Sequence, residues 1–139
     1  MLIGEYSHTI DIKGRLNFPV KLRESLGESF IITRGFDHCL NVYSLTEWNC
    51  LEQSIKNLPR NKRRDIERFF FSGAFEAVPD KQGRVVITAN LREYAMLDKN
   101  VVITGASDHV EIWDEALWNK EFKNLSPESI AQVMDELDF

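Results

Sequence analysis

The pentapeptide Asp11-Ile-Lys-Gly-Arg15 returns 69 residues later as Asp80-Lys-Gln-Gly-Arg84, and this repetition decides how the chain is organised. Further matches follow in the same order, with an offset between 69 and 71, as one or two loop insertions would produce. Solenoid repeats are shorter and more numerous. The chain is therefore predicted to be two copies of one small fold unit fused in tandem. The other matches are Leu22-Arg-Glu24 with Leu91-Arg-Glu93, Phe30-Ile-Ile-Thr33 with Val101-Val-Ile-Thr104, Asp37-His38 with Asp108-His109, Tyr43 with Trp113, and Trp48 with Trp118.

Each copy is predicted to begin with a β-hairpin. Apolar residues alternate over residues 8–10 and 16–18, on either side of a glycine-containing loop, which is typical of two short strands joined by a tight turn. Gly14, and Gly83 in the second copy, would supply the positive φ angle that such a loop needs.

Two aspartates are predicted to organise these loops. Asp11 and Asp80 stand where a carboxylate can accept hydrogen bonds from the loop's backbone N–H groups. Each is followed four residues later by an arginine, Arg15 or Arg84, which could brace the turn through an ion pair.

The rest of each copy is predicted to hold a short helix, two buried strands and a longer helix. Pro19 suits the first position of the short helix and Gly27 its end. Ser44-Leu-Thr-Glu47 is a capping box that opens the longer helix of the first copy, and Asp114 opens its counterpart. The predicted strands are 30–33, 40–42, 101–104 and 110–112, the helix that links the copies is 61–71, and a last helix opens at Ser126-Pro127 with an apolar stripe of Ile130, Val133, Met134 and Leu137.

Composition favours an ordinary globular protein, with an apolar share of 43%. No stretch approaches the roughly 18 apolar residues of a membrane helix, and the N-terminus lacks a signal core. Cys39 and Cys50 are too few for a disulfide framework and have no metal-ligand spacing, so reduced thiols in a cytosolic protein are expected.

Charge is distributed unevenly along the chain. The net charge is −5, but residues 1–75 carry 11 basic and 9 acidic side chains, whereas residues 76–139 carry 6 and 13. Nucleic-acid binders are usually basic. Any DNA-binding site must therefore be a local patch on a mostly acidic body.

The opening Gly4-Glu-Tyr…His8-Thr-Ile-Asp-Ile-Lys-Gly-Arg-Leu…Pro19 resembles that of the MraZ family. The second pentapeptide completes that family's doubled Asp-x-x-x-Arg signature, and the resemblance covers essentially the whole chain. The second copy departs from the first at Thr88, which stands where the first copy has Pro19. Threonine is a good N-cap, so the fold should be kept, although the two copies need not be functionally identical.

The resemblance implies an α+β fold, in which two tandem SpoVT/AbrB-like repeats form a β-rich, swapped-hairpin pseudo-dimer with flanking helices. The expected divisions are repeat 1 over residues 5–47, a helical linker over 48–75, repeat 2 over 76–118 and a C-terminal helical segment over 119–139. It also implies a cytoplasmic, nucleoid-associated regulator of the bacterial division and cell-wall gene cluster. Such a regulator binds short repeated boxes in double-stranded DNA upstream of its own operon, as a ring-shaped homo-oligomer such as an octamer.

The two loops are the candidate DNA contacts. An arginine can grip guanine O6 and N7 with two parallel donors, while lysine and backbone N–H groups can hold phosphates. The alternative is that each Asp–Arg pair only braces a tight turn, and both roles can hold if the aspartate orients the arginine. The proposed contacts are Lys13, Gly14, Arg15, Lys81, Gln82, Gly83 and Arg84.

The basic linker is a second, weaker DNA candidate. Asp65 and Glu67 interrupt its positive charge, and charge runs on helices are usually solvated faces. The three phenylalanines 69–71 are expected in the core or a subunit interface rather than as a base-stacking platform. The linker's basic residues are Arg60, Lys62, Arg63, Arg64 and Arg68.

Two other functional classes compete with DNA binding. Asp37-His38-Cys39 offers a carboxylate, an imidazole and a thiol, but adjacent residues point in different directions, and Val110 stands where the second copy would need a cysteine. No phosphate-binding glycine loop or zinc signature is present, so no catalytic residue, cofactor, metal or small-molecule substrate is predicted. An antitoxin-like protein-interaction module remains the alternative, because fold does not fix function.

Overall fold

Both copies fold into the same series of elements in the computed structural model, which describes residues 1–137. The first copy contains β1 (Glu5–Thr9), β2 (Arg15–Asn17), α1 (Val20–Leu26), β3 (Phe30–Arg34), β4 (Leu40–Ser44) and α2 (Leu45–Lys56). After α3 (Arg60–Phe70), the second contains β5 (Phe75–Ala77), β6 (Arg84–Val86), α4 (Ala89–Tyr94), β7 (Asn100–Gly105), β8 (Val110–Asp114) and α5 (Glu115–Lys123). α6 (Pro127–Met134) and the 3-10 turn η1 (Asp135–Leu137) follow. The last two residues of the predicted C-terminal segment lie outside the described residues.

The two copies exchange strands. The main sheet has the order β1-β7-β8-β4-β3-β5, and its neighbouring strands are antiparallel. β1 of the first copy pairs with β7 of the second, and β5 of the second pairs with β3 of the first. A small second sheet pairs β2 with β6, with Leu16 opposite Val85. The predicted α+β class with two tandem repeats is confirmed, and each copy supplies strands that the other copy's sheet needs.

The predicted local hairpin is wrong in its main pairing. Within the first copy, the residues around the loop are joined by the isolated bridge between Ile10 and Leu16, whereas all five residues of β1 face β7. The reason is that β2 pairs over all three of its residues with β6 of the second copy. The chain therefore passes from the main sheet to the small sheet at the loop, and β1 and β2 lie in different sheets.

Strand register confirms the drift in the repeat offset. Phe30 lies opposite Ser44 in the first copy, and Val101 lies opposite Asp114 in the second. The first strand of each pair is therefore offset by 71 residues and the second by 70. The insertions fall in the loops, where added residues disturb no strand pairing.

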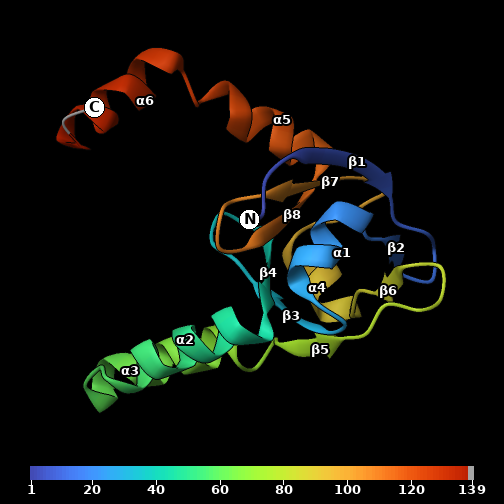
Figure 1. The fold of residues 1–139 in the computed structure, drawn as a ribbon, viewed down its shortest axis with the longest axis horizontal. Helices are drawn as coiled ribbons and strands as arrows, with labels where there is room; N and C mark the ends of the chain where they lie inside the picture. Colours follow the sequence, from blue (N-terminus) through green and yellow to red (C-terminus); the bar gives the residue numbers. More distant parts are fainter. Residues whose placement is uncertain (138–139) are drawn as a thin grey trace.

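One hydrophobic core is shared by both copies. α1 and α4 lie together on one side of the main sheet (Figure 1), and their Leu22 and Leu91 are both buried in this core. Leu16 and Val85, from the small sheet, belong to the same cluster. A chain of this length can fill one core well, and sharing it avoids two smaller and more exposed ones.

Helix ends follow several of the sequence signals, but the side chains of Asp114 and Thr88 form no capping hydrogen bond. Ser44 Oγ accepts the N–H of Glu47 at 3.2 Å, Ser126 Oγ accepts that of Ser129 at 3.1 Å, and Gly27 ends α1 with a φ angle of 98°. Thr88 precedes α4 but forms no capping hydrogen bond, and its Oγ1 is buried without a partner among the described residues. Thr88 therefore takes the expected N-cap position, but its hydroxyl does not cap the helix.

Two helical arms extend from one flank of the body (Figure 1). α2 and α3 form one arm, and α5 and α6 form the other. The β1–β2 and β5–β6 loops lie together at the opposite end of the molecule. Among the described residues, no helix is both long and apolar enough to cross a membrane.

Candidate nucleic-acid interface

The β1–β2 loop is held in shape by the Asp11 side chain. Its Oδ1 accepts hydrogen bonds from the backbone N–H groups of Lys13 and Arg15, both at 2.9 Å, and its Oδ2 accepts from Arg15 Nε at 2.6 Å. The backbone carbonyl of Asp11 also accepts the N–H of Gly14 at 2.9 Å. Gly14 has a φ angle of 83°, a conformation that L side chains rarely adopt.

The β5–β6 loop repeats this geometry. Asp80 Oδ1 accepts from the N–H groups of Gln82 and Arg84 at 2.9 Å, and its Oδ2 accepts from Arg84 Nε at 3.0 Å. Gly83 donates to the carbonyl of Asp80 at 2.9 Å and has a φ angle of 80°. The two sequence-predicted loops are therefore the same structural unit, used twice.

Hydrogen bonding sets the charge state of both carboxylates. The N–H of Arg15, with help from the Arg15 side chain, holds the pKa of Asp11 below its ordinary value of 3.8, and Arg84 does the same for the pKa of Asp80. Hydrogen bonds to the charged form are the physical cause, because protonation would remove an acceptor. Each aspartate therefore stays ionised and keeps its arginine oriented.

Each loop is hydrogen-bonded directly to a residue of the other copy. The N–H of Ile87 donates to the carbonyl of Gly14 at 2.8 Å, and the N–H of Phe18 donates to the carbonyl of Gly83 at 2.9 Å. Together with the β2–β6 pairing, these bonds fix the position of one loop relative to the other. A rigid pair of matched loops can meet two neighbouring positions on an extended ligand.

Sequence reasoning missed two arginines beneath the loops. A Cβ atom added to Gly83 would lie 2.8 Å from Arg23 Cζ, and one added to Gly14 would lie 3.1 Å from Arg92 Cζ. Arg23 also donates from Nε to the carbonyl of Phe18 at 3.0 Å. The signal was present in the sequence, since the repeated Leu-Arg-Glu tripeptides place an arginine at the same position in each copy.

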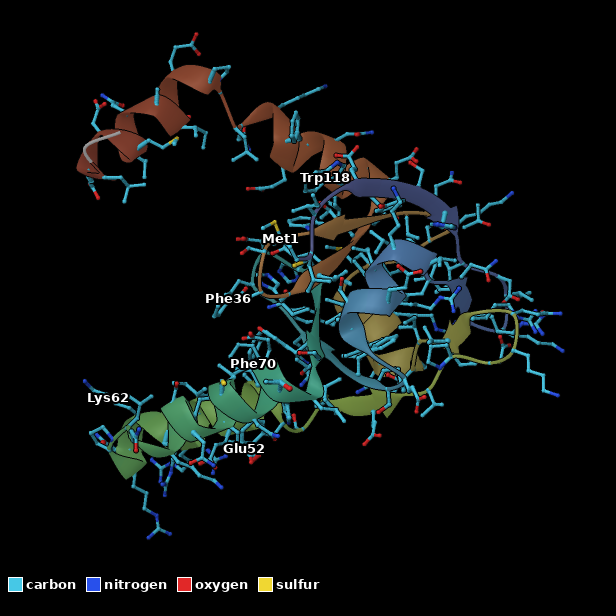
Figure 2. The ribbon with its side chains drawn as sticks, viewed as in Figure 1. Met1, Phe36, Glu52, Lys62, Phe70 and Trp118 are labelled. Atoms are coloured by element: carbon cyan, nitrogen blue, oxygen red, sulfur yellow. The ribbon has the colours of Figure 1, made fainter. Side chains whose placement is uncertain are left out.

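Both loops carry donors for an anionic ligand. Lys13, Lys81 and Gln82 are exposed, and the side chains of Arg15 and Arg84 are 36% and 31% exposed. Within the described residues, the ion pairs of both arginines run through Nε, and their Nη groups remain available as donors. Nitrogen-tipped side chains extend from the loops at the right of Figure 2.

The basic linker lies far from these loops. Lys62 is at the tip of the α2–α3 arm, on the opposite side of the molecule (Figure 2). Arg63 and Arg68 of the same helix pair with Glu67 and Asp65 along the helix. The structure therefore does not bring the two candidate DNA surfaces together.

The linker's phenylalanines pack within their own chain. Phe70 is buried, Phe69 and Phe70 both contact the ring of Phe36, and Phe71 contacts Trp48. These contacts agree with the core or interface role predicted for residues 69–71.

The Asp37-His38-Cys39 segment does not form a nucleophilic relay. Asp37 and His38 have φ angles of 58° and 57° and form a turn. His38 Nδ1 lies 3.3 Å from the carbonyl of Tyr94, whereas Cys39 Sγ donates to the carbonyl of Phe36 at 3.0 Å. Burial raises the pKa of the Cys39 thiol to about 12, so it stays protonated and a poor nucleophile. Within the described part of the chain, no group of three or more His, Cys, Asp or Glu side chains could hold a metal ion.

Comparison with known proteins finds the same family in each of the two copies. The sequence model of the family described as "MraZ protein, putative antitoxin-like" matches residues 1–69 and again 70–138. Similar proteins named "Transcriptional regulator MraZ" occur in Desulfitobacterium hafniense strain DCB-2 (58% identical, covering 99% of this chain and 96% of the relative) and in Caldicellulosiruptor saccharolyticus (53% identical, covering 99% of both). Another from Acetivibrio thermocellus is 51% identical over 96% of both chains.

Proposed function

This chain belongs to the MraZ family, and from that premise we propose that it is a transcription regulator that binds double-stranded DNA through its two Asp-x-x-Gly-Arg loops. One observation carries the proposal: both loops have the same hydrogen-bonded geometry and are fixed side by side across the β2–β6 pairing. Relatives of about 50% identity over the full length are named transcriptional regulators.

Each loop would contribute one base contact and several phosphate contacts. Arg15 and Arg84 are oriented by their aspartates, and a guanidinium whose Nε is held can still present two Nη donors to guanine O6 and N7. Lys13 and Lys81 would lie against phosphates, where charge matters more than orientation. Arg23 and Arg92 would support the loops from beneath through their contacts with Gly83 and Gly14.

The proposal extends to the arrangement of the fold and to the target. We take the exchange of strands between the copies as the swapped-hairpin arrangement of AbrB-like proteins, supported by the β1–β7, β3–β5 and β2–β6 pairings. The target would be short repeated boxes upstream of the protein's own operon, within the bacterial division and cell-wall gene cluster. The protein would then act at the nucleoid, in the cytoplasm.

The two arms support assembly into a ring of several copies. Val133 and Leu137, on the arm that ends the described chain, are 63% and 70% exposed although they are apolar. That arm carries Glu128, Asp135 and Glu136, whereas α3 on the other arm is rich in arginine and lysine. The acidic C-terminal arm of one copy could therefore contact the basic α2–α3 arm of the next copy, which is a head-to-tail contact. Such contacts close into a ring when the rotation between neighbouring copies permits.

Assembly into a ring would allow small loops on an acidic body to bind DNA firmly. One subunit has few cations with which to neutralise phosphates, so a single box should be bound weakly. Linking several weak binding sites raises overall affinity by about 10²–10⁴ when the spacing of boxes matches that of subunits.

Footprinting of the purified protein on the DNA upstream of its own gene tests this function. The expected result is protection of several short boxes of related sequence, at regular spacing, which weakens as the salt concentration rises. Uniform protection, or none at protein concentrations that saturate a positive control, would contradict the proposal.

A protein-binding role is the second candidate, because the family description itself reads antitoxin-like. The exposed apolar residues of the C-terminal arm could hold a protein partner instead of a second copy. A pull-down from the native host, together with a search for a toxin gene next to this one, separates the two roles: a stoichiometric toxin partner would favour the second.

A further inference from the structure

The tip of the β1–β2 loop carries an apolar side chain with no packing role. Ile12 is 96% exposed, although it stands between Asp11 and Lys13 in the centre of the proposed DNA surface. The bond from the N–H of Gly14 to the carbonyl of Asp11 makes residues 11–14 a β-turn, with Ile12 at its second position. That position accepts nearly any residue, so the turn itself does not require isoleucine.

The corresponding side chain of the other loop is chemically different. Lys81 occupies the position of Ile12, between Asp80 and Gln82, and it is also exposed. The hydrogen bonds that shape the two loops otherwise match closely, with backbone donors at 2.9 Å from the aspartate in both. The outward-facing residues therefore distinguish one loop from the other, whereas the backbone does not.

DNA offers one apolar group at the edges of its bases in the major groove, the 5-methyl group of thymine. An exposed isoleucine that precedes a base-reading arginine by three residues is suited to contact this group. A lysine in the same place would instead meet a phosphate.

We propose that Ile12 is a specificity-determining residue, which contacts the methyl group of a thymine beside the base read by Arg15, while Lys81 contacts a phosphate at the equivalent place. Because the two loops then read different features, each box is asymmetric and is bound in one orientation. This inference rests on the proposed DNA-binding function.

A methyl-deletion cycle tests the contact. Duplexes of the footprinted box are prepared with each thymine replaced in turn by deoxyuridine, which pairs identically but lacks the methyl group. They are titrated with the wild-type protein and with Ile12→Ala; Ile3→Ala, a truncation of another exposed isoleucine (63%), serves as the matched control. Circular dichroism melts establish that all three proteins are folded.

The wild type and Ile3→Ala should lose about fourfold in affinity at one or two thymine positions, which is the value of burying about one methyl group. Ile12→Ala should lose a similar factor on the unmodified box and show no further loss with deoxyuridine. Wild-type affinity for Ile12→Ala, or the same deoxyuridine sensitivity in both proteins, would overturn the inference. If Ile12→Ala binds every duplex more weakly by the same factor, the deoxyuridine sensitivity is unchanged and the inference is overturned, because this is the result expected for an apolar wedge between base steps.

Arg15→Ala, titrated in parallel, separates this inference from the function on which it rests. If Arg15→Ala loses specific binding while Ile12→Ala does not, the DNA-binding function stands and the role of Ile12 is wrong. If the wild type itself has no preference for the box over unrelated DNA, both fall together.

Discussion

At the scale of single residues, the two aspartates show how a short local pattern determines a structure. Asp11 and Asp80 bond to groups no more than four residues away, so the geometry of each loop follows from five consecutive residues. Contacts of this kind are predictable from sequence because no other part of the fold has to be known. The arginines beneath the loops, Arg23 and Arg92, could not be placed this way, since each touches the loop of the other copy.

The lowered pKa values of these aspartates predict how the loops respond to acid. A carboxyl with a depressed pKa in the folded state contributes stability above its unfolded value of 3.8, and this contribution is lost as pH falls through the folded value. Asp11→Asn should therefore melt at a lower temperature than wild type near neutral pH, and the gap should shrink as pH falls below 3.8. Calorimetric melts across this range provide the measurement. A gap that is unchanged at the lowest pH would show that the ion pair is not its cause.

His109 predicts a second pH dependence with the opposite sign. Its Nδ1 lies 2.7 Å from Asp108 Oδ1 and its Nε2 lies 3.0 Å from Glu111 Oε2. The hydrogen bond with Glu111, more than any other contact, raises the pKa of His109 above 6.5, and the same bond lowers the pKa of Glu111 below 4.5.

The stability that His109 adds is fully present below pH 6.5 and is lost as pH rises through its raised pKa, whereas the part from Glu111 is present above pH 4.5. Wild type should therefore exceed His109→Gln in stability most between these two values, with the difference declining in alkaline solution. Urea denaturation at a series of pH values measures this. A difference that grows with pH would contradict the assignment.

At the scale of elements, the sequence indicated which segments are strands but not their partners. The alternation around the first loop indicated two short strands, β1 and β2, and their partners turned out to be β7 and β6 of the other copy. Partner choice depends on the competition between all available strands, which a local pattern does not contain. Thr88 makes the same point, because its hydroxyl is buried by neighbours that were unknown from the sequence.

The two loop glycines should differ in their tolerance of a side chain. Alanine at either position is strained, by about 1–2 kcal/mol, because of the positive φ angle. At Gly14 the added Cβ would also lie 2.9 Å from the backbone carbonyl oxygen of Ile87, whereas at Gly83 the nearest atoms belong to the flexible Arg23 side chain. Gly14→Ala should therefore destabilise the fold more than Gly83→Ala in parallel denaturation curves. The reverse order would mean that the Arg23 contact is the more rigid one.

At the scale of the whole molecule, the paired loops and the two arms lie at opposite ends of the molecule (Figure 1). Under the proposed function, this separation would allow the arms to hold copies together while the loops face DNA. The duplication predicted the paired loops, but the direction in which the arms extend depends on the packing of α2 and α5 and was not visible in the sequence.

Assembly through the C-terminal arm predicts a charge-sensitive oligomer. Val133→Glu places a carboxylate in the apolar stripe of α6 and should reduce the assembly to smaller species, because burying an unpaired charge is costly. Gln132→Glu adds the same charge on the opposite side of the helix and should leave the assembly intact. Light scattering on a sizing column gives the mass of each. Equal masses for both variants and wild type would exclude this stripe from the interface.

The most direct test of the central claim is the affinity of a double variant, Arg15→Ala with Arg84→Ala, for the DNA upstream of the protein's own gene. A second double variant, Arg60→Ala with Lys62→Ala, loses the same charge on the distant arm and serves as the control, provided that light scattering shows it to keep the mass of the wild-type assembly. If each loop arginine reads a base, the loop variant should lose about 1–3 kcal/mol of specific binding for each contact, while its melting curve stays within a few degrees of wild type and the arm variant binds nearly as the wild type does. Wild-type affinity in a folded loop variant would contradict the claim that the two loops are the DNA-binding surface.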